Sequence, residues 1–217
     1  MKKKVYFYTI YERIWHWLQA GCVLALLFTG FEISFFSRFS IIDFKTAVSV
    51  HNIVGMILVV NAFLALFYNL AGGLLKRYVP ELEDFSPLGF THAGYYFYGI
   101  FRGDPHPFDK TPEKRLLPLQ KITYFIILNG LLPLMTLTGL LKWSMKFTPV
   151  YAEMFGGLSV LGPIHRFGAW LFLSFVIVHV YMTTTGHTPF SSLVSMITGY
   201  EYIENNETLE ILDEKKT

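Results

Sequence analysis

Four long apolar runs alternate with polar segments along this chain of 217 residues. The runs extend over about residues 14–35, 47–71, 122–143 and 164–185. Each has about the 20 residues that a helix needs to cross the hydrocarbon core of a bilayer. Because a segment in lipid can satisfy its backbone hydrogen bonds only as a helix or in a closed barrel, the pattern predicts an all-α integral membrane protein built as a four-helix bundle.

The polar segments set the expected topology. The connection at residues 72–121 is long and, together with residues 1–13, holds most of the Lys and Arg residues. Cytoplasmic segments of membrane proteins are enriched in these residues, so we expect both termini, and this inner connection between the second and third spans, in the cytoplasm. Residues 1–200 are predicted to form one membrane domain, followed by an acidic, poorly ordered tail at residues 201–217.

Smaller features carry predictions of their own. Residues 85–101 are rich in aromatic side chains, which is typical of a segment at the lipid interface and equally of a cytoplasmic loop packed on its own rings. Residues 191–200 predict a short amphipathic helix on the inner surface. Pro133 is expected to bend the third span because it removes one intrahelical hydrogen bond. Glu12 and Arg13 interrupt the approach to the first run, which favours an uncleaved span over a signal peptide.

The composition agrees with a membrane protein and limits its chemistry. The chain is 53% apolar, 18% aromatic and 16% charged, as expected for an integral membrane protein. Its net charge of +2 is too small to indicate a nucleic-acid partner. Cys22 is the single cysteine, so no internal disulfide can form, and without a Cys-x-x-Cys-His sequence no haem can be attached covalently.

Four histidines lie inside the apolar runs: His16, His51, His165 and His179. Ionisable side chains at membrane depth are costly and usually mark a functional site. His165 and His179 are 14 residues apart, so on a helix they fall within about 40° of each other and roughly 21 Å apart along the axis. With antiparallel neighbouring spans, His16 and His179 lie toward the inner face, and His51 and His165 toward the outer face.

Two such pairs favour haem ligation. Neutral imidazole is a good axial ligand for haem iron, and two histidines per iron leave no open position, which suits electron transfer. A single membrane histidine often only hydrogen-bonds a neighbouring helix, but two depth-matched pairs favour ligation. We therefore predict two non-covalent b haems, an inner one on His16 and His179 and an outer one on His51 and His165, carrying electrons across the bilayer.

Residues near the histidines fit this prediction. A porphyrin between helices needs backbone without bulky side chains, and Ala20, Gly55 and Gly168 each follow a histidine by three or four residues. Arg13 and Arg166 are placed to pair with haem propionates, or alternatively to reach the headgroups as interfacial side chains. His92 and His106 lie in the polar connection and are expected to be solvated. His187 is either a surface residue or a proton-handling neighbour of a bound quinone.

Several short motifs resemble a known family over about residues 8–187. They are Tyr11-Glu12-Arg13 with Trp15-His16-Trp17, Thr29-Gly30, His51 with Gly55, Pro118-Leu119-Gln120-Lys121 with Tyr124, Thr138-Gly139, and the His165 and His179 pair. In this order they are similar to the di-haem cytochrome b membrane subunits of respiratory formate dehydrogenases, nickel-iron hydrogenases and thiosulfate reductases. The resemblance implies a four-helix bundle whose two b haems are ligated by histidines at the four positions named above.

The resemblance also implies partners and a substrate. Such subunits associate with an iron–sulfur subunit and a catalytic subunit of hydrogenase, formate dehydrogenase or thiosulfate/polysulfide reductase type. They exchange electrons with menaquinone or ubiquinone near the inner haem, which places Gln120, Lys121, Tyr124 and His187 at a quinone site. Gln120 and Lys121 also read as plain helix-start residues. The Pro-Leu before Gln120 resembles the thiosulfate reductase branch more than the formate dehydrogenase branch. The implied location is a bacterial or archaeal cytoplasmic membrane.

Two other functions stay open at this point. One is a stand-alone redox enzyme of the cytochrome b561 type that oxidises a small molecule directly with quinone. The other is a haem-free transporter or membrane anchor whose histidines form a proton path. The first predicts purification without companion chains, and the second predicts no haem absorption.

Overall fold

The computed structural model describes residues 2–38, 40–85, 94–104, 118–185 and 188–204, and the fold is given for these residues. They form two compact units. The helical unit consists of Trp15–Val79 and Ile122–Val178. The terminal unit consists of the described residues within Met1–Ile14, Pro80–Lys121 and His179–Thr217. Each unit is described by itself below.

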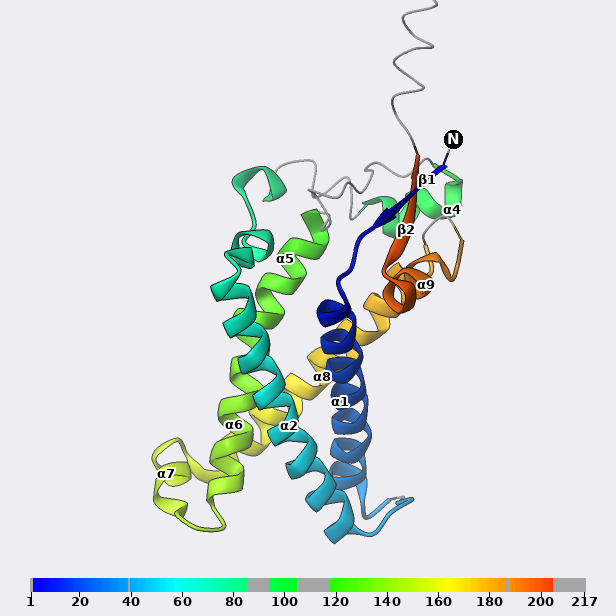
Figure 1. Cartoon of the computed structure of the whole chain (residues 1–217). Helices are drawn as coiled ribbons and strands as arrows, with labels where there is room; N and C mark the ends of the chain where they lie inside the picture. Colours follow the sequence, from blue (N-terminus) through cyan, green and yellow to red (C-terminus); the bar gives the residue numbers. More distant parts are fainter. Residues whose placement is uncertain (1, 39, 86–93, 105–117, 186–187, 205–217) are drawn as a thin grey trace, which may run out of the picture. The chain divides into compact units, whose positions relative to one another are not determined.

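Four long apolar helices dominate the fold. They are α1 (Ile10–Phe35), α2 (Phe44–Ala71), a third that runs through α5 (Pro118–Ile126), η4 (Ile127–Leu131) and α6 (Leu132–Ser144), and α8 (Gly157–Thr183). Each has 26 to 28 residues, about 40 Å of helix, which exceeds the roughly 30 Å hydrocarbon core. The predicted all-α membrane fold with four spans is therefore confirmed. Within the helical unit α1 and α6 run in one direction and α2 and α8 in the other (Figure 1).

Local side-chain contacts explain where two of the helices begin. The Thr9 and Glu12 side chains bond each other's backbone N–H groups, at 3.2 Å to Thr9 Oγ1 and 2.7 Å to Glu12 Oε2, which is a capping box at the start of α1. Asp43 caps α2 by accepting from the Thr46 N–H at 3.0 Å. Hydrogen bonds from Thr46 hold the pKa of the Asp43 carboxyl below its ordinary value.

The third span contains an irregular helical turn next to Pro133. The π-helical turn η4 ends at Leu131, and α6 starts at Leu132 with Pro133 in its first turn. A proline inside a helix has no N–H to donate and clashes with the carbonyl four residues earlier, and a single wider turn accommodates this. The structure has a π turn just before Pro133, and the bend expected from the sequence at this residue stays a prediction.

The core of the helical unit draws on all four spans. Cys22, Leu58, Leu131, Leu132 and Phe172 form one buried cluster. Large apolar side chains also lie on the outside, for example Phe63 at 67% and Phe67 at 64% exposure. In water such a surface would be unfavourable, but a bilayer accommodates it.

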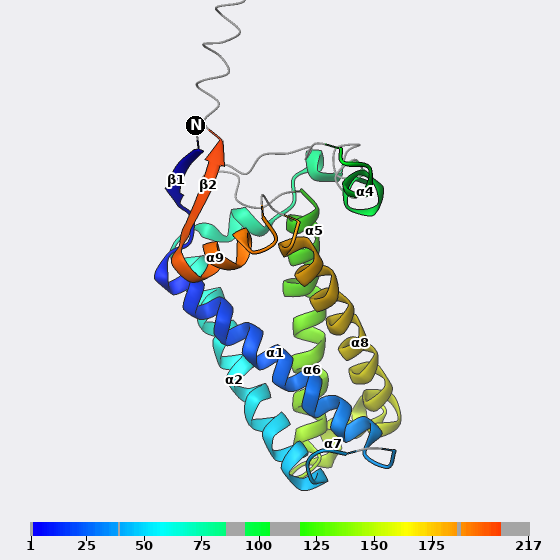
Figure 2. The ribbon, with the colours of Figure 1, turned by 90° about the vertical axis from the view of Figure 1, so that its right-hand side faces the viewer.

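The two ends of the chain form a small sheet in the terminal unit. β1 (Lys2–Tyr6) pairs antiparallel with β2 (Tyr200–Glu204), with Tyr6 opposite Tyr200 (Figure 2). The Tyr6 and Tyr200 rings lie 5.2 Å apart, and Lys4 Nζ lies 4.5 Å from the centre of the Tyr200 ring. The poor order expected from residue 201 onward is therefore wrong for residues 201–204, and the sheet was not predicted.

A short helix leads into this sheet. α9 (Ser191–Thr198) confirms the helix expected at residues 191–200. It ends at Gly199, whose φ of 87° is readily adopted only by glycine. The Gly199 carbonyl accepts from the Phe7 and Tyr8 N–H groups at 2.8 and 3.1 Å, so the turn after α9 is fixed to the strand end of β1.

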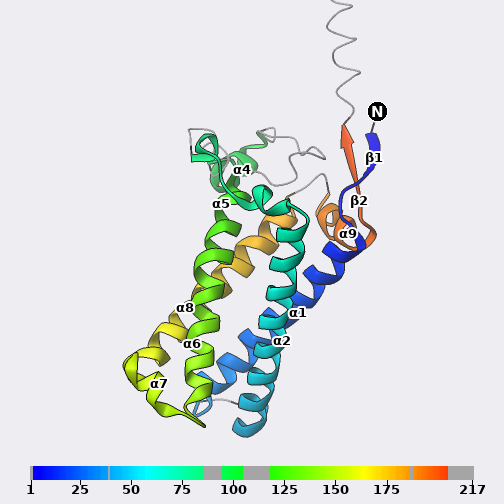
Figure 3. The same cartoon turned by 60° about the vertical axis from the view of Figure 1, so that its left-hand side comes forward.

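The remaining described elements are short. In the helical unit η1 (Leu74–Tyr78) follows α2, and α7 (Pro149–Met154) lies between α6 and α8 in the chain (Figure 3). In the terminal unit there are η2 (Leu82–Phe85), η3 (Tyr95–Gly99) and α4 (Ile100–Arg102). The Tyr181 hydroxyl donates to the Tyr96 carbonyl at 3.0 Å. Residues 86–93 lie outside the described part, so the interfacial segment expected at residues 85–101 stays a prediction.

Candidate functional site

The predicted outer pair of histidines meets inside the helical unit. His51 on α2 and His165 on α8 have ring centroids 6.2 Å apart, with the ring planes at 72°. A metal ion bound at about 2 Å by one nitrogen of each imidazole holds the two ring centres roughly 6 Å apart. Both side chains are half-buried between helices. The spacing therefore fits two imidazole ligands of one metal ion.

Each ring of this pair is held by a threonine on another span. Thr29 Oγ1 of α1 lies 2.9 Å from His51 Nδ1. Thr138 Oγ1 of α6 lies 2.8 Å from His165 Nδ1. Thr29 and Thr138 are 2% and 3% exposed, so both contacts are shielded from solvent. With Nδ1 occupied, each imidazole has Nε2 left as the nitrogen for a metal.

A glycine follows each threonine and faces the same ring. A Cβ added at Gly30 would lie 3.4 Å from His51 Cε1, and one added at Gly139 would lie 3.4 Å from His165 Cε1. The two Thr-Gly pairs belong to the motifs quoted for the family resemblance, which implied no role for them. The available signal was the same dipeptide recurring in two spans.

Two cations lie near the outer pair. Lys142 is in the last turn of α6, four residues after Thr138, and therefore on the same side of that helix. Arg166 directly follows His165 on α8. Arg166 is exposed and Lys142 half-buried. No acidic partner of Lys142 is found among the described residues, so the two cations suit a carboxylate ligand. Arg166 was predicted in this role, and Lys142 was missed.

The predicted inner pair, His16 and His179, is divided between the two compact units. His16 on α1 belongs to the helical unit, and His179 near the end of α8 to the terminal unit. Both side chains are half-buried. The His16 and Trp17 rings lie 5.2 Å apart at 85°. Their pairing around one haem stays a prediction.

Unsatisfied donors gather at the start of α1. Trp15 Nε1 and Arg13 Nε are buried, and within the described part of the chain neither has a hydrogen-bond acceptor. Leaving a buried donor unpaired costs about 1–3 kcal/mol, so these two donors would suit a hydrogen-bond acceptor such as a carboxylate. Arg13 Nη1 meanwhile donates to the Ile197 carbonyl in the last turn of α9. Arg13 therefore makes a structural contact through Nη1, while its Nε–H could still donate a hydrogen bond to a ligand.

The two predicted haem-lining glycines differ in their surroundings. Gly168 is buried, and a Cβ added there would lie 2.4 Å from Met135 Sδ. A Cβ added at Gly55 would have only Leu26 Cδ2 within 4 Å, at 3.9 Å. Gly168 thus leaves room for the Met135 side chain, whereas an added Cβ at Gly55 would make only an ordinary van der Waals contact. The haem contacts of both residues stay predictions.

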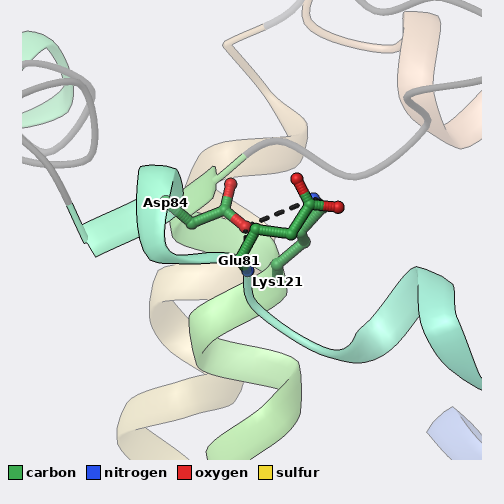
Figure 4. Close-up of polar contacts among 3 residues, drawn as sticks. All are labelled: Glu81, Asp84 and Lys121. Carbon is green, nitrogen blue, oxygen red and sulfur yellow. Dashed lines mark hydrogen bonds and ion pairs between the residues drawn. The ribbon is translucent and has the colours of Figure 1, made fainter.

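Lys121, predicted as a quinone contact, takes part in an ion pair. Lys121 Nζ lies 3.2 Å from Asp84 Oδ2 and 3.9 Å from Glu81 Oε1 (Figure 4). Asp84 Oδ2 also accepts from the Glu81 N–H at 2.8 Å. The Lys121 side chain is 16% exposed and that of Asp84 9%. These contacts support the plain alternative, a structural residue at the start of a helix.

Two of the other predicted quinone residues, Gln120 and Tyr124, lie one turn apart on the third span. Tyr124 belongs to the helical unit, where its ring lies 6.4 Å from that of Phe175. Gln120 is half-buried at the start of α5. His187 lies outside the described residues, as do the two histidines of the polar connection, His92 and His106.

Most of the chain matches a known protein family. The profile of the prokaryotic cytochrome b561 family matches residues 7–199. The chain belongs to this family. Cytochromes of the b type hold non-covalent haem, so this chain is a multi-pass membrane haem protein with a b-type cofactor. The predicted family and class of cofactor are confirmed, while the number of haems and their ligands stay predictions.

Three curated proteins are similar to this cytochrome. The putative cytochrome YdhU of Escherichia coli (strain K12) is 31% identical over 199 residues, covering 91% of this chain and 75% of its own length. The probable Ni/Fe-hydrogenase B-type cytochrome subunit of Rhizobium leguminosarum bv. viciae is 25% identical, covering 95% and 92%. The putative protein-methionine-sulfoxide reductase subunit YedZ1 of Azospira oryzae is 24% identical, covering 92% and 100%.

Proposed function

We propose that this chain is the membrane cytochrome b subunit of a respiratory oxidoreductase complex. In this proposal it carries electrons between the quinone pool and an iron–sulfur or multihaem partner through two b haems, each with two histidine ligands. The observation that carries the proposal is the outer pair, because the 6.2 Å separation of the His51 and His165 rings suits two ligands of one iron.

The chain's own residues define the outer site. Haem, when bound, supplies an iron that accepts and releases one electron at a time. His51 and His165 would hold it as its two protein ligands, and ligation by two histidines suits electron transfer rather than oxygen chemistry. Lys142 and Arg166 would neutralise its carboxylates. The apolar surroundings of α2, α6 and α8 would keep water from the site.

The inner site is proposed on His16 and His179. Because His179 is 14 residues after His165 on α8, one helix would contribute to both sites, roughly 21 Å apart along its axis. The buried donors Trp15 Nε1 and Arg13 Nε would find an acceptor in a haem carboxylate. Menaquinone or ubiquinone would react on this side, near Gln120, Tyr124 and His187.

The relatives favour a subunit over a stand-alone enzyme. Two of the three similar proteins are named as subunits, one of a hydrogenase and one of a reductase. We therefore propose an iron–sulfur subunit and a catalytic subunit of hydrogenase, formate dehydrogenase or sulfur-compound reductase type as partners. Membership in a cytochrome family leaves the haem-free transporter or anchor without support.

Single histidine substitutions test this function. We expect two haems per polypeptide in the purified wild type, and one haem in each of the variants His16→Ala, His51→Ala, His165→Ala and His179→Ala. The measurement is a pyridine haemochromogen assay normalised to protein, together with a reduced-minus-oxidised spectrum. His92→Ala, in the polar connection, is the matched control and should retain both haems. One haem in the wild type, or full haem content in the four variants, would contradict the proposal.

A further inference from the structure

The two contacts between threonine and histidine have the same geometry although they come from different helices. In each, a Thr hydroxyl lies 2.8 or 2.9 Å from a His Nδ1 on another span. In each, the following glycine brings its backbone to the Cε1 side of the same ring, where a Cβ would lie 3.4 Å away. Two independent occurrences of one arrangement indicate a shared requirement rather than accidental packing.

The direction of these hydrogen bonds follows from counting hydrogens. Thr29 Oγ1 is 2.7 Å from the Ala25 carbonyl, and Thr138 Oγ1 is 2.7 Å from the Leu134 carbonyl. A hydroxyl has one hydrogen, and a carbonyl oxygen can only accept, so that hydrogen goes to the helix backbone. The threonine oxygen can then only accept from the imidazole. Nδ1 must therefore be the protonated nitrogen of His51 and of His165.

The tautomer set in this way is the one that a metal ligand needs. With the proton on Nδ1, the lone pair is on Nε2, the nitrogen on the other side of the ring. A hydrogen bond from Nδ1–H also fixes the ring's rotation and makes the imidazole a stronger donor to the metal. The glycines leave out a Cβ that would lie in direct contact with the ring, 3.4 Å from Cε1.

We infer that Thr29 and Thr138 are the positioning residues of the outer haem site, each fixing the tautomer and orientation of the histidine that it contacts. This inference rests on the proposed function, because it needs His51 and His165 to be ligands. It goes further by assigning a role to two residues that would not touch the iron. Neighbours of this kind typically change metal affinity 10- to 100-fold when they are removed.

The test replaces each hydroxyl by a methyl group of similar size. In Thr29→Val and Thr138→Val we expect the outer haem to be lost 10- to 100-fold more readily, while the inner haem is retained. Where the outer haem remains, its midpoint potential should rise, because a weaker imidazole donor stabilises the oxidised iron less. A tenfold change in the relative affinity for the two oxidation states corresponds to about 59 mV for one electron.

Two further substitutions separate positioning from general packing. Thr29→Ser and Thr138→Ser keep the hydroxyl and should retain the wild-type potential and haem content. Ser174→Ala removes a hydroxyl on α8 that donates to the Trp170 carbonyl of the same helix at 3.0 Å, and should behave as wild type. The readouts are a potentiometric titration of the haem absorption and the haem content per polypeptide.

The results separate this inference from the proposed function. If His51→Ala and His165→Ala lose one haem but the valine variants match Ser174→Ala, only the positioning role is overturned. If the two histidine variants retain all haem, the proposed outer site itself fails. Should a valine variant not fold, Thr29→Ala and Thr138→Ala introduce no branched side chain, and an unchanged potential in these would equally overturn the inference.

Discussion

The ion pair between Lys121 and Asp84 allows a sharp test of a residue with two possible roles. The two side chains are 16% and 9% exposed, and Nζ lies 3.2 Å from Oδ2. Removing one partner of a buried pair leaves a charge without compensation and costs about 3–5 kcal/mol. Glu81 is 71% exposed and only 3.9 Å from the ammonium, so it can compensate Lys121 in part. We therefore expect Asp84→Asn to lower the free energy of unfolding less than Lys121→Met, because Lys121→Met leaves the Asp84 carboxylate without a cation.

A double-mutant cycle measures the interaction energy between Lys121 and Asp84. We expect Lys121→Met to lower the free energy of unfolding by about 3 kcal/mol and Asp84→Asn by about 2 kcal/mol. The double variant should lose less free energy of unfolding than the sum of the two single variants, because it leaves neither charge of the pair without its partner. The assay is reversible unfolding in mixed detergent micelles, followed by the haem absorption. Moderate salt should change these values little, because a mostly buried pair is weakly screened.

The same variants separate the structural role from quinone binding. If Lys121 only holds η2 to the start of α5, both single variants should change stability while the apparent KM for a soluble quinone analogue stays at the wild-type value. If Lys121 binds quinone, Lys121→Met should raise KM and Asp84→Asn should not. Additive losses, or losses below about 0.5 kcal/mol as for an exposed pair, would refute the reasoning from burial.

Three further predictions concern single side chains. Thr9→Ala breaks the capping box of α1 and should cost about 1 kcal/mol in the same unfolding assay, whereas Thr198→Ala on the exposed face of α9 should cost less. Asp43 has a lowered pKa in the folded protein, so its contribution to stability is present above the unfolded pKa and is lost as pH falls through the folded pKa. Asp43→Ala should remove this part of the acid sensitivity in unfolding curves recorded at several pH values. Lys142→Met removes a cation beside the outer pair and should lower the midpoint potential of the outer haem, because positive charge favours the reduced state. An unchanged potential would place the Lys142 charge away from the cofactor, and Lys142→Arg should keep the wild-type value.

The sequence predicts what depends on one segment at a time. The four spans follow from apolar length, and helix α9 from a local amphipathic pattern. The sheet of β1 and β2 could not be predicted, because Lys2–Tyr6 begins with three lysines and its partner is at the other end of the chain. The ion pair of Lys121 with Asp84 likewise joins residues that are 37 positions apart.

The candidate site divides in the same way. The ligand histidines are visible in the sequence because an ionisable residue in an apolar run is conspicuous. Thr29 and Thr138 are not conspicuous in the sequence, because a threonine in a membrane helix usually hydrogen-bonds to the backbone of its own helix. Here each does so and also contacts a histidine. Only the packing of α1 on α2, and of α6 on α8, reveals the second contact.

The outer site takes one residue from each of the four spans of the helical unit. Thr29 is on α1, His51 on α2, Thr138 on α6 and His165 on α8, so the site is complete only when all four spans have assembled. A ligand that binds only the assembled state stabilises it in proportion to the logarithm of its concentration over its dissociation constant. Haem bound by these residues would therefore contribute to the association of four helices whose outer surfaces are apolar and gain little from burial in lipid. Loss of either threonine then weakens both the cofactor site and the coupling between the spans, whereas loss of a lipid-facing residue affects neither.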